Sequence, residues 1–192
     1  MEQKNQDMTS GSLAKGILFF SIPLMLSNIL QVLFNMSDIA VVGHFAGAMA
    51  LGSVGSTTIL VTMFTGFLIG LSGGINVLVA LYYGAKNERG VKETVHSAAI
   101  LSLIIGVILL LIGAGFSRNI LELLKTKEEL LDGAVLYIRL YFLGLPALAL
   151  YNFGNAVFSA VGDTKRPLLY LAVAGVLNIL LNLFFVVVCQ MG

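Results

Sequence analysis

A single carboxylate interrupts the first long apolar stretch of this chain. Between residues 16 and 42 the only charged side chain is that of Asp38. The stretch is long enough to cross a bilayer, which takes ~20 apolar residues at a rise of ~1.5 Å each. An ionised carboxylate at mid-bilayer costs ~2.5 kcal/mol or more, so it usually faces a wet cavity or a partner. We therefore interpret Asp38 as a reversible proton or cation site; the alternative is an interfacial residue that snorkels to water.

Asp38 shares one face of its predicted helix with three amide side chains. At 100° per residue, the amides and Asp38 fall within an arc of roughly 80°. Asn178 and Asn182, in the last apolar stretch, stand one turn apart and would also share a face. Hydroxyls can bond to carbonyls of their own helix, so Thr residues indicate a cavity less strongly than amides do. The candidate cavity-lining residues are Asn28, Gln31, Asn35, Thr58, Thr62, Thr65, Asn76, Asn152 and Asn155.

The groups that an enzyme would need are missing from the apolar stretches. A hydrolytic or transfer site requires a carboxylate pair, a Ser/His pair or a metal triad, and none of these occurs there. No GxxxxGK[ST] loop is present to bind a nucleotide, so a pump built on this chain would have to use an ion gradient. We therefore predict no enzyme activity, no catalytic residue, no cofactor and no metal centre.

The composition is that of an integral membrane protein. Hydrophobic residues make up 58% of the 192 residues and charged residues 11%, against roughly 25% charged in soluble domains. The net charge of +1 and the absence of a basic stripe with interleaved aromatics argue against a nucleic-acid partner. Cys189 is the only cysteine, so no intrachain disulfide can form. The predicted fold class is all-α, a polytopic membrane helix bundle in a lipid bilayer.

Hydropathy divides the chain into a polar tail and five spans. The tail covers residues 1–12, and the spans cover about 13–42, 48–83, 95–116, 131–160 and 168–189. Segment 117–131 is amphipathic and is predicted to lie on the membrane surface, with Thr126 and Glu129 as a capping box for the fourth span. Gly66, Gly70 and Gly74 form a small-xxx-small stripe, which predicts a close helix contact.

Lys and Arg residues set the predicted orientation. Seven of them fall in the tail and in the loops after the second and fourth spans, and three fall in the loop after the third span. Positive residues collect in cytoplasmic loops, so we predict a cell-membrane protein with a cytoplasmic N-terminus. The eleventh, Arg139, lies inside the fourth span and is expected to snorkel to the interface, with cavity lining as the alternative.

The order of several short motifs resembles the multidrug and toxic compound extrusion (MATE) family over essentially the whole chain. The resemblance implies a transporter of twelve helices in two six-helix lobes, which exports cationic or amphipathic compounds in exchange for protons or sodium. This chain would be most of the N-terminal lobe, without its sixth helix and without the C-terminal lobe, and is not expected to transport alone. The motifs are Pro23, Gln31, Asp38, Val42-Gly43, Tyr83-Gly84-Ala85-Lys86, Gly144-x-Pro146, Gly162-Asp163-Thr164-Lys165-Arg166-Pro167 and Leu177-Asn178-Ile179.

The resemblance also implies a coupling site. In the family a first-helix acid and a fifth-helix Asn-x-x-x-Asp pair form it, which corresponds to Asp38, Asn178 and Asn182 here. The chain departs from the pattern, because Asn182 stands where Asp is common and Leu183 where Pro often follows. With one carboxylate instead of two, a sodium site at these three residues would be weak, so proton coupling is favoured.

Two other functions stay open at this point. A lipid-linked oligosaccharide flippase of the same superfamily would have a similar lobe with a more cationic cavity, for which Arg139 is the one available residue. A non-transporting membrane subunit would use the polar stripes for helix association instead.

The orientation can be tested by thiol labelling. After replacement of Cys189, an Ala46→Cys protein should react with an impermeant maleimide added to intact cells, because the turn after the first span is predicted to lie outside. A Lys86→Cys protein should stay unlabelled until the membrane is opened. The opposite pattern would show an inverted topology.

Overall fold

The computed structural model describes residues 13–188, and these residues fold into five long helices without a strand. The helices are α1 (Leu13–Val41), α2 (Gly47–Gly84), α3 (Glu88–Leu123), α4 (Glu128–Ala160) and α5 (Lys165–Leu183). Short π-helical segments, η1 (Val42–Ala46) and η2 (Phe184–Val188), follow α1 and α5. The all-α prediction is confirmed. The expected tail and Cys189 lie outside the described residues.

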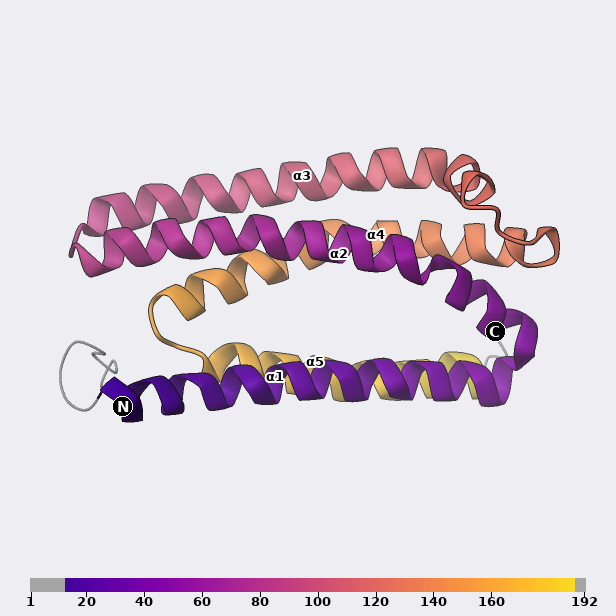
Figure 1. Ribbon diagram of the computed structural model, residues 1–192, viewed down its shortest axis with the longest axis horizontal. Coiled ribbons are helices and arrows are strands. Elements are labelled where there is room, and N and C mark those ends of the chain that lie inside the picture. Colours follow the sequence, from indigo (N-terminus) through magenta and orange to yellow (C-terminus); the bar gives the residue numbers. More distant parts are fainter. Residues whose placement is uncertain (1–12, 189–192) are drawn as a thin grey trace.

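The helices form two layers that lie side by side along their length (Figure 1). One layer contains α1 and α5, and the other contains α2, α3 and α4, with α4 in contact with both of its neighbours. The α2–α3 and α4–α5 turns lie at the end of the molecule where α1 begins, and the α1–α2 and α3–α4 connections lie at the opposite end. The chain therefore crosses from end to end with each helix.

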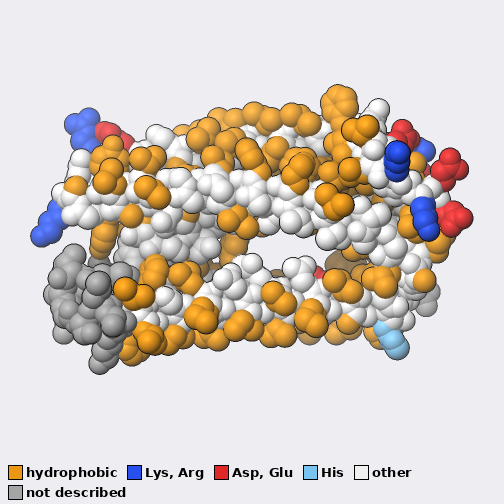
Figure 2. Space-filling model, in the orientation of Figure 1, with side chains coloured by type: hydrophobic (Ala, Val, Ile, Leu, Met, Phe, Trp, Pro, Cys, Tyr) orange, Lys and Arg blue, Asp and Glu red, His pale blue; other side chains and the backbone are white. Residues whose placement is uncertain are grey.

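Charged side chains gather at the two ends of the molecule, and hydrophobic side chains cover the face between them (Figure 2). All five long helices are long and apolar enough to span a membrane. In a bilayer every backbone N–H and C=O must be satisfied within the chain, which long helices achieve. The chain is therefore a multi-pass membrane protein.

Tight packing joins α3 to α4. Gly113 lies directly against the ring of Phe142, which is fully buried. Two turns earlier on α3, a Cβ atom on Gly106 would lie 2.7 Å from the Cα of Pro146. Such a contact is possible only without a side chain, so these two glycines set the distance between the helices. In the other layer Gly175 of α5 receives the ring of Phe34 of α1 in the same way.

The predicted surface helix at residues 117–131 is wrong. Its first part continues α3 to Leu123, its last part starts α4 at Glu128, and a short turn separates the two. The reason is that Ser117 and Leu121 are fully buried in the packed helices, so α3 continues through this segment, while Leu123 and Leu124 at its end stay exposed. Helix α3 thus extends beyond both ends of the predicted span 95–116.

Two smaller predictions fail. The capping box is not formed, because the N-cap of α4 is Lys127 and no side chain caps that helix end. The connection after the first span is π-helical through Ala46, and the chain reverses at Gly47, whose φ of 87° suits glycine. Nothing lies within 4 Å of a Cβ built on Gly66, Gly70 or Gly74, so that stripe makes no close helix contact in the described structure.

We predict opposite effects for two alanine substitutions on α3. Gly106→Ala should lower stability by about 1–3 kcal/mol, because the methyl group meets the backbone at Pro146. Gly115→Ala should leave the stability unchanged or raise it by up to ~1 kcal/mol, since no atom lies within 4 Å of the added methyl group and alanine favours the helix. Thermal unfolding of the detergent-solubilised proteins, followed by circular dichroism, measures both. Equal midpoints for the two variants would contradict this packing.

Candidate functional site

A cavity of about 410 Å³ lies between the two layers, near the end where α1 passes into α2. Figure 2 shows an opening between the layers on the face that it presents. The volume is within the ~300–1,000 Å³ typical of small-molecule sites. Helices α1, α2, α4 and α5 and segment η1 all contribute to it. The lining residues are Asn35, Asp38, Ile39, Val42, Leu51, Val54, Thr57, Thr58, Val61, Thr62, Tyr137 and Asn182.

Asp38 and Asn182 meet in this cavity. The Asn182 Nδ2 amide donates a hydrogen bond of 2.7 Å to Asp38 Oδ1, across 144 residues of sequence. A hydrogen bond to an ionised acceptor is roughly twice as strong as a neutral one. Packing of Phe34 against Gly175 brings α1 and α5 close enough for this contact. The second carboxylate oxygen of Asp38 makes no described hydrogen bond and is available to a proton, a cation or water.

Five of the residues predicted from the sequence line the cavity. They come from three helices, which the structure brings together at this cavity. These residues are Asn35, Asp38, Thr58, Thr62 and Asn182.

The other seven predicted residues lie outside this cavity, and two of them make hydrogen bonds between helices. Thr65 Oγ1 lies 2.6 Å from Tyr141 Oη, which joins α2 to α4. Asn76 donates a 2.8 Å hydrogen bond to the Ala156 carbonyl, and Asn152 bonds to its own helix. Asn28, Gln31 and Asn178 are exposed, and Asn155 is half-buried. The structure therefore brings Asn182 to Asp38 and leaves Asn178 apart, although both were predicted for the coupling site.

Tyr137 is a lining residue that the sequence analysis missed. It comes from α4 and lines the cavity together with Asn182 of α5 and Asp38 of α1. The sequence did contain a signal, because Tyr137 and Tyr141 stand one turn apart in the fourth span and therefore share a face. Tyr141 bonds to Thr65 and to the Val61 carbonyl, just beyond the cavity wall.

Asp38 is the only charged residue among those lining the cavity, and no Lys or Arg is present there. Arg139 belongs to α4 but is not a lining residue; its Nε donates to Ser117 Oγ of α3 at 3.0 Å. In the described part of the chain, no three His, Cys, Asp or Glu side chains gather to hold a metal ion. The arrangement suits reversible binding of a proton or a small cation, or of a ligand with one positive charge.

The fold and the cavity define a class, a multi-pass helical membrane protein with one carboxylate in a cavity between its helices. A model of the MatE family matches residues 23–184, so the chain belongs to this family, whose members are transporters and not enzymes.

Individual relatives agree with the family assignment. The chain is 35% identical over 191 residues to the probable multidrug resistance protein YpnP of Bacillus subtilis, covering 98% of this chain and 42% of that protein. A MOP superfamily transporter from Pyrococcus furiosus superposes with a TM-score of 0.91 at 26% identity, covering all of this chain and 42% of the other. A multidrug resistance MATE family transporter in an outward-facing conformation superposes with a TM-score of 0.90, again covering all of this chain and 42% of the other. The chain thus spans about two-fifths of the length of these relatives.

Thiol chemistry can test whether the cavity holds water. Once Cys189 has been replaced, Thr58→Cys should react rapidly with a charged, membrane-impermeant methanethiosulfonate, because Thr58 lines the cavity. The neighbouring Ile59→Cys is the control: Ile59 is exposed outside the cavity, where lipid would cover it, so reaction should be at least about tenfold slower, since a thiol reacts as the thiolate, which needs water. Equal rates would contradict a wet cavity.

Proposed function

We propose that this chain is part of a secondary active antiporter that exports cationic or amphipathic compounds in exchange for protons, or for sodium, with Asp38 as the coupling residue. The observation that carries the proposal is the Asp38–Asn182 pair inside the cavity between the two layers. An isolated carboxylate that faces a cavity in a membrane protein is a typical site for ion coupling.

Protons are favoured over sodium by the charge of the site. Sodium is a hard cation that prefers several oxygen ligands with compensating negative charge, whereas a proton needs one carboxylate oxygen. The cavity offers one carboxylate, and the amide of Asn182 occupies one of its two oxygens. The charge of the site also bears on the substrate. A cavity whose one charged residue is an acid suits organic cations.

The proposed transporter is larger than this chain. Alternating access requires two halves that move about a central site, and the relatives are more than twice as long. We therefore propose that a second lobe completes the substrate path, and that the protein lies in the cell membrane with its N-terminus in the cytoplasm. The flippase alternative is disfavoured, because a pyrophosphate group needs cationic partners and the cavity lining contains no Lys or Arg.

Substitution of Asp38 tests the proposal in the transporter that carries this chain. Asp38→Asn should reduce gradient-driven efflux to the background level, since an amide cannot release a proton. Asp38→Glu should keep part of the activity, because the acid moves by about one methylene. Asn182→Asp should introduce a dependence on sodium by adding a second carboxylate. Efflux is measured in cells of matched expression, with the proton and sodium gradients varied separately.

Asp132→Asn is the control for this series. Asp132 is an exposed acid at the start of α4, outside the cavity, so efflux should stay close to that of the unmodified protein. Full export by the Asp38→Asn protein would falsify the assignment of Asp38. Loss of export in both variants would point to a general effect of charge and also count against it.

A further inference from the structure

Arg139 is a charged residue in a membrane-spanning helix, and it does not line the cavity. It lies eleven residues after Glu128, the first residue of α4, which is ~16 Å along the helix axis. On a helical wheel it is about 160° from Tyr137, the residue of α4 that lines the cavity. Its neighbours Leu136, Leu140 and Leu143 are all exposed. The side chain of Arg139 is itself exposed in the described structure, on the same side of α4 as these leucines.

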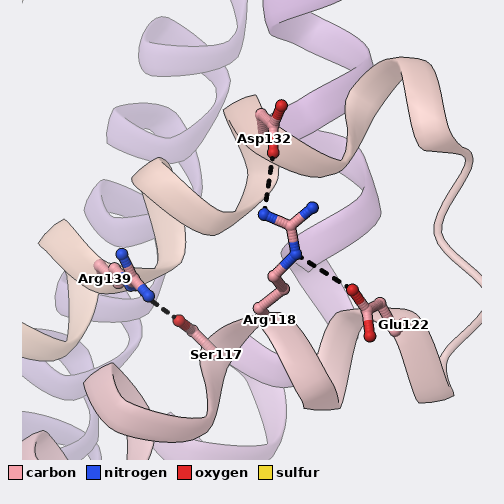
Figure 3. A network of polar contacts seen from close by, with 5 residues as sticks. All are labelled: Ser117, Arg118, Glu122, Asp132 and Arg139. Carbon is pink, nitrogen blue, oxygen red and sulfur yellow. Dashed lines mark hydrogen bonds and ion pairs between the residues drawn. The ribbon is translucent and has the colours of Figure 1, made fainter.

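A buried serine holds the guanidinium in place (Figure 3). Arg139 Nε donates a 3.0 Å hydrogen bond to Ser117 Oγ, and this hydroxyl donates in turn to the Ala114 carbonyl at 3.2 Å. Ser117 is fully buried in α3 and cannot follow the arginine into solvent. With Nε engaged, the two terminal NH₂ groups of Arg139 form the free edge of the guanidinium.

The nearby acids are already paired with another arginine. Arg118, next to Ser117 in the chain, contacts Glu122 at 3.1 Å and Asp132 at 3.4 Å (Figure 3). In the part of the chain that the structure describes, no carboxylate lies within 4.0 Å of Arg139. A positive charge next to lipid tails is costly unless an anion or water compensates it. Arg139 therefore presents an oriented, uncompensated guanidinium edge.

We propose that Arg139, positioned by Ser117, binds the phosphodiester of an anionic phospholipid. The free edge of a guanidinium matches two phosphate oxygens, which a lysine cannot do. Helix side chains slant toward the helix N-terminus, so Arg139 reaches toward the end of α4 where headgroups lie. The exposed leucines beside it would contact the acyl chains. This site is on the opposite side of α4 from the cavity and does not depend on the proposed transport function.

Lipid titration followed by native mass spectrometry tests this proposal on the protein in a neutral detergent. The probe is phosphatidylglycerol. Arg139→Gln should weaken its binding about tenfold, the effect expected for loss of a charge-assisted hydrogen-bonded pair. Arg139→Lys should show a smaller loss, because the charge stays and the planar edge is lost. Ser117→Ala should also be intermediate, since it frees the guanidinium to rotate.

Arg89→Gln is the matched control. It removes one guanidinium and one positive charge at the α2–α3 end, where Arg89 contacts Glu93 at 2.7 Å. Its affinity for phosphatidylglycerol should stay within about twofold of the unmodified protein, because long-range charge effects are screened. An equal loss in Arg89→Gln and Arg139→Gln would overturn the proposal in favour of a general effect of net charge.

Two further measurements distinguish a lipid headgroup from a soluble phosphate as the ligand. Phosphatidylcholine should bind more weakly than phosphatidylglycerol, because its own cation competes with Arg139, and soluble glycerol phosphate should fail to displace the lipid. Displacement by glycerol phosphate at equal concentration would overturn the lipid assignment. Unchanged lipid binding in Arg139→Gln would overturn the site. A change of the measured mass from dimer to monomer in that variant would show that Arg139 contacts a second copy instead, and would also overturn it.

Discussion

The cost of a carboxylate away from bulk water is the constraint on which this structure depends. Asp38 is the only charged residue of its helix between residues 16 and 42, and the amide of Asn182 donates a hydrogen bond to it at 2.7 Å. That contact requires α1 and α5 to lie close together. Gly175 permits this approach by leaving room for the ring of Phe34, one turn before Asp38. The need to solvate or pair the Asp38 carboxylate therefore accounts both for the contact of α1 with α5 and for the polar lining of the cavity.

The two layers of the bundle differ in how they are held. Buried apolar side chains and closely approached glycines join α2, α3 and α4, with Phe142 and Leu68 fully buried between them. The layer of α1 and α5 meets this unit along a cavity whose walls come from both layers. One layer thus contributes the carboxylate, and the other contributes hydroxyls and a tyrosine. Neither layer forms the cavity alone.

The two charged residues that lie deep in the spans have opposite surroundings. Asp38 faces the cavity and an amide donor, while Arg139 faces outward and bonds to a buried hydroxyl. The separation leaves the cavity with a negative residue and no positive one. The net charge of the chain is therefore a poor guide to the cavity, because a nearly neutral chain has a cavity lined by one acid and no Lys or Arg.

Much of this arrangement could be predicted from the sequence, because the bilayer limits what an apolar stretch can do. Five spans and the isolation of Asp38 follow from hydropathy, and the family resemblance follows from motif order. The limits of α3 could not be predicted in this way. Residues 117–123 have the amphipathic pattern of a surface helix, and only the tertiary packing decides that Ser117 and Leu121 are buried by protein.

The sequence by itself determined the class of protein, the number of spanning helices in the described chain and the intramembrane carboxylate, Asp38, since each depends on local composition. The tertiary structure decided which polar residues meet that charge. Asn178 and Asn182 have nearly the same direction on α5, yet Asn182 alone reaches Asp38, and Tyr137 enters from a helix that was predicted for its amides. Helical periodicity fixes the direction of a side chain, whereas the level at which two helices approach each other depends on glycines and aromatic rings far apart in the sequence.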